Sequence, residues 1–182
     1  MPRRVSPITI TANDRYKIYG VMDPVLTWGI TAGSLVDGDA VTGALARVSG
    51  EQVGSYVILQ GTLDAGENYA ITYVPGEITI GARPLTVTAD ARSKVYGGTD
   101  PELTWALTSG TLLDGDAITG ALVRVAGESA GSYTIGQGSL SAGDNYAITY
   151  VPADFVIATR SITVAAHAAS KIYGDADPAL TW

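Results

Sequence analysis

The protein has 182 residues, and its 11 basic residues against 18 acidic ones give a net charge of −7 with histidine neutral. Cysteine is absent, which excludes disulfides and thiolate metal sites. The acidic balance argues against binding to nucleic acids or to anionic membranes, because both partners are negatively charged. No apolar run in the sequence approaches the roughly 20 residues of a membrane span.

Residues 1–10 lack the apolar core of a secretory signal peptide, so we expect any export signal to lie outside this sequence. The runs rich in Thr, Val, Ile and Tyr that follow predict short strands bounded by turn residues. They span residues 8–12, 54–58, 69–74, 77–80 and 85–89. Residues 115–128 have some helical character, but Gly120 and an alternating apolar pattern favour a strand or a strand pair. We therefore predict a mainly β fold with at most one short helix in each unit.

One sequence unit occurs twice and begins a third time. The segment YGVMDPVLTW at 19–28 returns as YGGTDPELTW at 96–105 and as YGDADPALTW at 173–182, with a constant spacing of 77 residues. An alignment of 6–82 with 83–159 needs no gap and gives 46 identities. A unit that is copied whole at a fixed period indicates a repeat array.

The period predicts two modules, 6–82 and 83–159, followed by the truncated start of a third at 160–182. If a unit instead runs from one LTW motif to the next, the modules are 29–105 and 106–182. A module of 77 residues buries roughly 60% of its unfolded surface, which is marginal for independent folding. In the first phase the modules carry 3 basic and 8 acidic residues, then 4 and 8, so both are acidic.

The connection between the modules is very short. The predicted strands end at Ile80 and begin again at Pro84, which leaves Gly81, Ala82 and Arg83 between them. So few residues cannot decouple two domains, and Pro84 fixes φ at the start of the next strand. We expect a stiff head-to-tail rod in which each module contacts mainly the adjacent repeats.

In each repeat, Tyr-Gly is followed by Asp-Pro and Leu-Thr-Trp, then by GD, G-x-L-x-R, GE, G-x-Y-x-I, NY and a final strand. This order resembles the MBG domain of the YGX type, over both full repeats and the fragment. The resemblance implies a non-catalytic, extracellular module, found in tandem in large exported bacterial proteins such as filamentous haemagglutinin-like adhesins. It also implies a β-rich fold related to the small β-grasp domains of mucus-binding adhesins. An immunoglobulin-like sandwich is the alternative architecture.

The Tyr-Gly to Trp motif has two interpretations. In the first, it is an anchored loop, because Gly relaxes the backbone, Asp caps a turn, Pro stiffens it and the aromatic residues attach it to the core. These anchors are Tyr19, Gly20, Asp23, Pro24 and Trp28, and then Tyr96, Gly97, Asp100, Pro101 and Trp105. In the second, the Tyr and Trp side chains form an exposed platform that stacks on sugar rings. Aromatic residues of a small domain are more often buried, which favours the anchor.

Two acidic turns offer oxygen ligands of the kind that Ca²⁺ prefers. They contain Asp37 and Asp39 in the first copy and Asp114 and Asp116 in the second. The spacing matches no calcium loop, and a D-x-D turn without further ligands is more often solvated. Calcium is nevertheless the one cofactor that the sequence suggests.

Each repeat also contains the three groups that an intramolecular Lys–Asn amide crosslink requires, a substitute for disulfides. They are Lys17, Asn68 and Glu51 in the first copy and Lys94, Asn145 and Glu128 in the second. In this hypothesis the carboxylate holds the lysine neutral. The alternative is an exposed strand lysine and a turn asparagine.

The sequence predicts that the protein is not an enzyme. Its one histidine, His167, lies in the fragment, and Asn13 and Asp90 stand at the matching positions of the full repeats. No catalytic triad can be assembled within a module, and neither a phosphate-binding glycine loop nor a nucleophile elbow occurs in the sequence.

Two functions fit these observations. In the first, the repeats form a stalk or spacer of a large adhesin at the bacterial cell surface. In the second, each repeat weakly binds a glycan or a surface protein and gains from multivalency. Burial of Tyr19, Trp28 and their copies would favour the spacer, whereas an exposed repeated patch would favour binding. Homotypic association is a further contact, because the incomplete strand at 162–166 would be disordered or would dock on the open edge of another chain.

Overall fold

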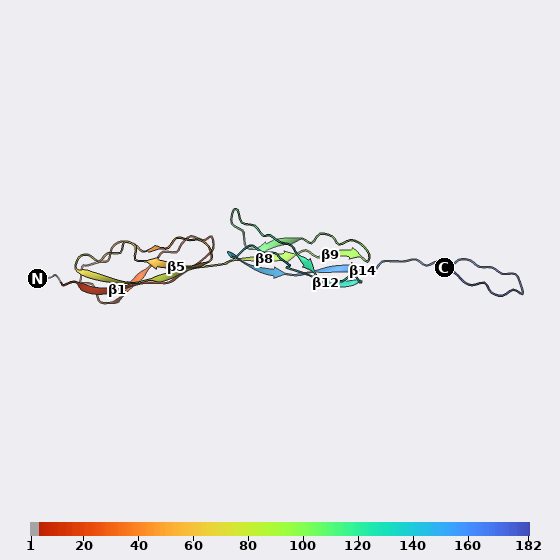
Figure 1. The fold of residues 1–182 in the computed structure, drawn as a ribbon, viewed down its shortest axis with the longest axis horizontal. Helices are drawn as coiled ribbons and strands as arrows, with labels where there is room; N and C mark the ends of the chain where they lie inside the picture. Colours follow the sequence, from red (N-terminus) through yellow and green to blue (C-terminus); the bar gives the residue numbers. More distant parts are fainter. Residues whose placement is uncertain (1–3) are drawn as a thin grey trace.

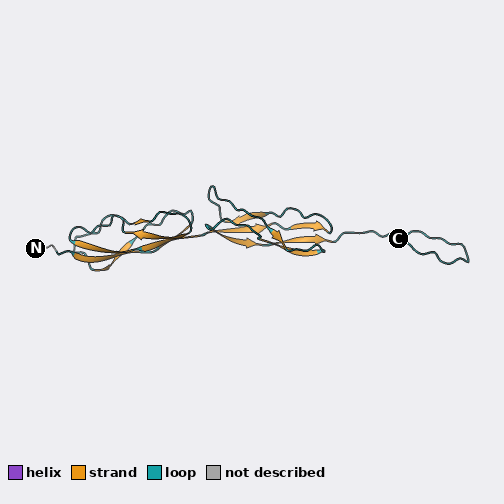
Figure 2. Ribbon diagram, viewed as in Figure 1, coloured by secondary structure: helices purple, strands orange, loops and turns teal. Residues whose placement is uncertain are grey.

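The structure is a computed structural model that describes residues 4–182. These residues form an elongated chain of two β modules, followed by an extended segment that ends in a loop folded back on itself (Figure 1). The strands lie mainly along the long axis of the chain, and residues 4–182 contain no helix (Figure 2). The prediction of mainly β modules in a rod-like tandem is confirmed, and the short helix that it allowed is not needed.

The two repeats have the same strands in the same order. Repeat 1 contains β1 (Ser6–Ala12), β2 (Arg15–Ile18), β3 (Trp28–Ala32), β4 (Ala46–Arg47), β5 (Gly54–Leu59), β6 (Tyr69–Val74) and β7 (Gly76–Gly81). Repeat 2 contains β8 (Arg83–Ala89), β9 (Arg92–Val95), β10 (Trp105–Ser109), β11 (Val123–Arg124), β12 (Gly131–Gly136), β13 (Tyr146–Val151) and β14 (Ala153–Ala158).

Each repeat contains two sheets, and consecutive strands at its two ends, such as β1 and β2 or β6 and β7, belong to different sheets. In repeat 1 the strand orders are β3-β1-β6 and β2-β7-β5-β4, and in repeat 2 they are β10-β8-β13 and β11-β12-β14-β9. Each of these strands pairs only within its own repeat. The paired strands of repeat 1 thus lie within residues 6–81 and those of repeat 2 within 83–158, and a boundary at residue 29 would separate most of β3 from its partner β1.

Alternation of apolar and polar residues explains the strands. In β1 the side chains of Ile8, Ile10 and Ala12 are buried, and the residues between them are partly exposed. In β7 Ile78 and Ile80 are buried, while Glu77 and Thr79 face solvent. This is the pattern of sheets with one buried face and one solvated face.

The core of each repeat is small and continuous with the partly buried aromatic residues. In repeat 1, Ile8, Ile10, Leu63 and Ala65 form a cluster against which Trp28 and other side chains pack. In repeat 2, a cluster contains Ala89, Ile135, Phe155 and Ile157. Because each core is thin, contacts at the ends of the module contribute a larger share of its stability than in a bigger domain.

Two segments differ from their sequence-based expectation. Of residues 115–128, only Val123–Arg124 forms a strand, with one isolated bridge between Thr119 and Ser141, and the rest is irregular. Glycines in the left-handed region, such as Gly120 at φ 92°, interrupt the pairing there. Residues 159–182 contain no strand, so the predicted strand at 162–166 is absent from this segment.

Candidate functional site at the joint between repeats

The tyrosine of the first Tyr-Gly motif lies between the two repeats. Tyr19 follows β2, at the end of repeat 1 that faces repeat 2, and its N–H donates to the Gly81 carbonyl over 2.9 Å. Its ring meets the ring of Tyr146 edge to face, with centroids 5.5 Å apart and planes at 79°. Its hydroxyl donates to Asp116 over 3.1 Å, and the Tyr146 hydroxyl donates to the same carboxylate over 2.6 Å. The motif therefore contributes directly to the joint.

The glycine of the motif allows close contact with repeat 2. Gly20 has φ +76°, a conformation that favours glycine, and an added Cβ would lie 2.3 Å from Cδ1 of Leu113. Leu113 belongs to the loop that holds Tyr146, because its N–H donates to the Tyr146 hydroxyl over 2.9 Å. Any larger residue at position 20 would displace this loop or the turn itself.

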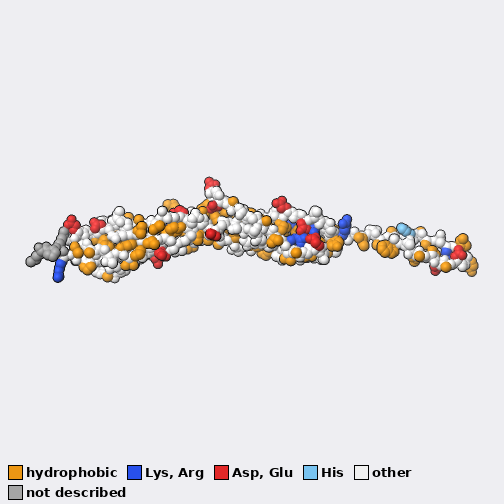
Figure 3. Space-filling view, in the orientation of Figure 1, with side chains coloured by type: hydrophobic (Ala, Val, Ile, Leu, Met, Phe, Trp, Pro, Cys, Tyr) orange, Lys and Arg blue, Asp and Glu red, His pale blue; other side chains and the backbone are white. Residues whose placement is uncertain are grey.

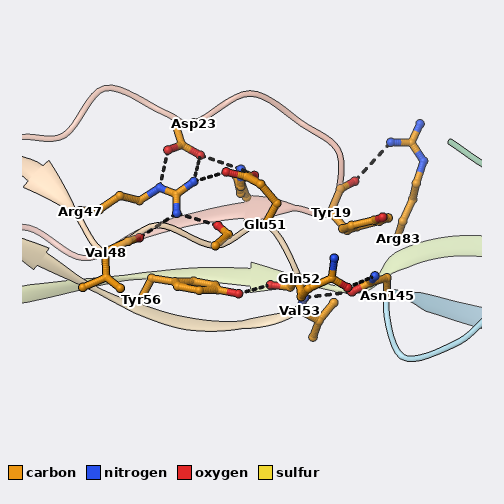
Figure 4. A network of polar contacts seen from close by, with 12 residues as sticks. Tyr19, Asp23, Arg47, Val48, Glu51, Gln52, Val53, Tyr56, Arg83 and Asn145 are labelled. Atoms are coloured by element: carbon orange, nitrogen blue, oxygen red, sulfur yellow. Dashed lines mark hydrogen bonds and ion pairs between the residues drawn. The ribbon is translucent and has the colours of Figure 1, made fainter. Parts of the chain in front are cut away.

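Arg83, the first residue of β8, makes hydrogen bonds to both repeats at the joint. Nη1 of Arg83 donates to the Tyr19 carbonyl over 3.3 Å (Figure 4). Its Nε and Nη2 donate to the carbonyl and hydroxyl of Thr111, over 3.0 and 2.9 Å. The guanidinium thus connects the end of repeat 1 to a loop of repeat 2, as a planar group with several fixed donors can.

A second set of contacts lies beside the tyrosines and is made by Asn145, the residue before Tyr146. The side-chain oxygen of Asn145 accepts from the Val53 N–H over 3.0 Å, and its amide nitrogen donates to the Gln52 side chain over 2.5 Å (Figure 4). Since β7 ends at Gly81 and β8 begins at Arg83, only Ala82 separates the strands. A one-residue connection with two adjacent sets of contacts leaves little freedom for one repeat to move relative to the next.

A cluster of four charges supports the repeat 1 side of the joint. Nζ of Lys17 lies 2.6 Å from Asp23 and 2.5 Å from Glu51, and Arg47 binds the same two carboxylates. Nη1 of Arg47 also donates to the Gly50 carbonyl over 2.7 Å, and its guanidinium lies over the Tyr56 ring. The cluster fixes the segment just before Gln52 and Val53, so it positions the residues that contact Asn145.

The charges in this cluster stabilise one another. Burial lowers the pKa of Lys17, but hydrogen bonds to Asp23 and Glu51 outweigh burial and raise it above its ordinary value. The hydrogen bond from Arg47 lowers the pKa of Asp23, although burial opposes the shift. Hydrogen bonds from Lys17 and Arg47 lower the pKa of Glu51. All four groups therefore stay ionised at neutral pH.

The same cluster occurs in repeat 2. Lys94 lies 2.6 Å from Asp100 and also binds Glu128, and Arg124 lies 2.6 and 2.5 Å from these carboxylates. In the segment 160–182 the corresponding Lys171 and Asp177 form a pair at 2.5 Å. The loop after Tyr-Gly is therefore held by an ion pair in all three copies.

Comparison with known proteins identifies the repeats. The description MBG domain (YGX type) matches residues 8–79 and 85–156, which together make up most of the chain. The chain belongs to this family. Neither a curated protein nor a solved structure matches it. MBG domains are typical of bacterial surface proteins, in which they are repeat modules.

The structure places the predicted aromatic anchors of the MBG repeats in two environments. Trp28 packs against the core of repeat 1, and Trp105 is also half-buried. Tyr19 is half-buried at the joint, whereas Tyr96 is 52% exposed. Asp23 and Asp100 hold their loops through ion pairs, and Pro24 and Pro101 follow them. Tyr19 and Trp28 are both half-buried, whereas a sugar platform requires exposed rings.

The acidic turns bind tyrosines of their own MBG repeats. Asp39 accepts from the Tyr69 hydroxyl over 2.6 Å, and Asp116 accepts from Tyr146 over the same distance. Asp37 and Asp114 are exposed neighbours in these turns. Over residues 4–182, no three His, Asp or Glu side chains are grouped so that they could hold a metal ion. Asp116 also accepts from Tyr19, so the turn of repeat 2 forms part of the surface that receives the Tyr-Gly motif of repeat 1.

The groups of the amide-crosslink hypothesis are only partly brought together. Glu51 contacts Lys17, and Glu128 contacts Lys94, as that hypothesis requires. Asn68, however, precedes β6 at the opposite end of repeat 1, because its carbonyl accepts from Ser6 at the start of β1. The hydrogen bonds that raise the pKa of Lys17 favour its charged form, whereas the hypothesis requires a neutral amine.

Several functional residues were not singled out from the sequence. Arg47 and Arg124 complete the charge clusters, and their appearance in the repeated G-x-L-x-R motif was the available signal. Arg83, Leu113 and Tyr146 form the joint with Tyr19. Their role depends on which ends of the two repeats are in contact. The periodicity of the sequence does not predict this. His167 closes the loop of the third copy, because its backbone N–H donates to the Thr181 carbonyl over 3.0 Å.

Proposed function

We propose that this chain is a non-catalytic stalk segment of a large bacterial surface adhesin, in which MBG repeats extend a distal domain away from the cell. The observation that carries the proposal is the packed joint of Tyr19, Gly20 and Arg83 with repeat 2. A spacer needs a fixed relation between successive modules, and this joint supplies one. No helix long and apolar enough to cross a membrane occurs in residues 4–182.

The surface of the rod also fits a spacer. Its visible face mixes apolar, acidic and neutral side chains along both repeats, and acidic side chains form small separate groups (Figure 3). A net charge of −7 keeps such an extended chain soluble. Secretion and attachment to the cell surface are part of this proposal.

Distances between equivalent positions of the two repeats test the proposal. The chain has no cysteine, so Val57→Cys and Thr134→Cys, both on exposed strand positions one period apart, give a unique pair of spin-label sites. We expect a single narrow distance distribution and a rod-like scattering profile. A broad distribution, with scattering from two independently moving modules, would contradict the spacer.

A glycan-binding screen tests the competing function. The folded chain is passed at high concentration over an array of bacterial and host glycans, and the heat-unfolded chain is the control. Retention that saturates, and that Trp28→Ala and Trp105→Ala abolish without unfolding the chain, would favour a binding module over a spacer.

A further inference from the structure

The strands at the two ends of each MBG repeat pair in parallel. In repeat 1, β1 pairs with β6 from Ser6 opposite Tyr69 to Thr11 opposite Val74. β2 pairs with β7 from Arg15 opposite Ile78 to Ile18 opposite Gly81. Parallel neighbours need a long connection between them, and here most of the repeat lies between the paired strands. The chain therefore enters repeat 1 through β1 and β2 and leaves it through β6 and β7. β1 is hydrogen-bonded to β6, and β2 to β7.

This arrangement determines how a pull on the ends acts. Tension draws β1 backward from its start at Ser6 and draws β7 forward from its end at Gly81. Because β6 continues directly into β7, separated from it by Pro75 alone, β1 must slide along β6 before the repeat can extend. β7 must likewise slide along β2. The hydrogen bonds of both pairs are then strained together along the strand direction, rather than broken one after another.

The force passes from one repeat to the next along a nearly straight path. β7 ends at Gly81 and β8 begins at Arg83, and both strands lie along the axis of the rod (Figure 1). In repeat 2, β8 pairs in parallel with β13, and β9 with β14. Each repeat thus has the same two parallel pairs in series.

We propose that each repeat is a tension-resisting module, whose parallel strand pairs β1–β6 and β2–β7, with β8–β13 and β9–β14 in repeat 2, are sheared when the chain is pulled from its ends. The proposal rests on the stalk function, since a stalk between a cell and a surface carries force. It adds a mechanical activity that a mere spacer does not need.

The main test compares the force that opens repeat 1 when it is pulled in two different directions. Handles at Val5→Cys and Thr159→Cys, both exposed, pull the two repeats through their ends in a single-molecule force experiment. Handles at Val5→Cys and Ala70→Cys pull β1 and β6 apart from the same end of repeat 1, because Pro7 lies opposite Ala70. Forced unfolding depends on the unfolding barrier in each direction. We expect repeat 1 to open at a force lower by about two-fold or more when it is pulled across the strands. Equal forces in both directions would overturn the proposal.

A variant that removes one ladder donor gives the second test. Ser6 donates to the Asn68 carbonyl, so the regular spacing of a parallel ladder directs the N–H of Thr72 to β1. Thr72→Pro removes that donor, and its side chain is exposed. Repeat 2 is unchanged and serves as an internal control within each trace. We expect two unfolding events, of which only that of repeat 1 moves to lower force.

Leu63→Ala is the matched control for ordinary destabilisation. Leu63 is buried in the core of repeat 1 but lies outside the parallel pairs. Its truncation lowers stability through a cavity and leaves the ladder intact. At equal loss of stability in urea, Thr72→Pro must reduce the unfolding force more than Leu63→Ala does. If the two variants reduce it equally, the ladder is not what resists the pull.

The two proposals can fail separately. A narrow spin-label distance together with low, direction-independent unfolding forces would leave the spacer and remove the mechanical role. A flexible joint with high forces for each repeat would remove the stiff spacer, because the force measurement reports on the strands within a repeat.

Discussion

Tyr19 and Tyr96 stand at the same position of two similar repeats, but their surroundings differ. Both N–H groups donate to the end of the last strand of their repeat, Tyr19 to Gly81 and Tyr96 to Ala158. Tyr19 then contacts Tyr146 and Asp116 of the next repeat, whereas Tyr96 is 52% exposed. The motif therefore has two separable parts, an internal anchor that each repeat supplies and a joint that requires a complete neighbour.

The glycines that follow show the same difference. Gly20 and Gly97 have φ of +76° and +78°, so the turn itself is identical. A Cβ at Gly20 would collide with Leu113, but at Gly97 its nearest neighbour would be Nη1 of Arg160 at 3.5 Å. Matched substitutions in the two copies can therefore separate the cost of the turn from the cost of the joint.

The largest effect is expected from the charge cluster that supports the joint. Arg47→Leu leaves Asp23 and Glu51 without their guanidinium partner, and should lower the free energy of unfolding of repeat 1 by about 1–3 kcal/mol. It should also broaden the distance between labels at positions 57 and 134. Urea unfolding and spin-label distances measure the two effects.

Arg124→Leu is the matched variant, because it breaks the equivalent cluster away from this joint. It should destabilise repeat 2 in the same direction and leave the label distance narrow. An equal broadening with both variants would mean that the cluster does not act through Gln52 and Val53.

Acid should weaken the clusters of both repeats. The pKa values of Asp23 and Glu51, and of Asp100 and Glu128, are lowered in the folded state by their hydrogen bonds to arginine and lysine. The resulting stabilisation is complete above the unfolded pKa values and is lost as pH falls through the lower folded values. At pH values below about 4 the melting temperature should therefore decrease, and this decrease should be smaller in the Arg47→Leu variant. A pH profile identical in both proteins would contradict this assignment.

Alteration of the tyrosine should affect the joint without affecting the module. Tyr19→Ala removes the edge-to-face contact with Tyr146 and the hydrogen bond to Asp116. We expect a broader label distance and a melting temperature lower by a few degrees. Tyr96→Ala, which removes an exposed ring, should change neither. A similar loss in both variants would assign the tyrosine to its own repeat rather than to the joint.

The smallest effect is expected at the second contact of the joint. Asn145→Ala removes exposed hydrogen bonds to Gln52 and Val53, and should weaken the coupling between repeats by about 0.5–1 kcal/mol. Combination with Gln52→Ala in a double-mutant cycle isolates the side-chain pair. Additive effects on the coupled unfolding of the two repeats would show that the pair contributes nothing.

The sequence was sufficient for the fold class and for the positions of the regularly alternating strands. The alternation in residues 8–12 and 69–74 corresponds to β1 and β6, because one side of each sheet is buried and the other is solvated. It was not sufficient for β2, where the four residues Arg15–Ile18 are too short and too polar to show a pattern. The parallel pairing was also out of reach, since alternation reports which face is buried but not which strand is the neighbour.

The candidate site was predictable in part. The repeated Tyr-Gly and Asp-Pro segments were recognised as anchors, and their lysine and glutamate were noted as partners. The interpretation as a crosslink assumed that Asn68 lies near Lys17, which depends on the direction of β6 relative to β2. The joint itself needs the end of one copy and the start of the next, so no property of a single repeat could reveal it.

Ala82, the single residue between β7 and β8, has a consequence for how such proteins change in length. Insertion of one residue there would rotate the next strand to its other face and separate Arg83 from Tyr19. Gain or loss of a whole period of 77 residues, by contrast, keeps the main joint positions in register, since Tyr96, Gly97 and Arg160 stand one period after Tyr19, Gly20 and Arg83. Unequal recombination between copies can therefore lengthen or shorten the array in steps of 77 residues that preserve the register of these positions.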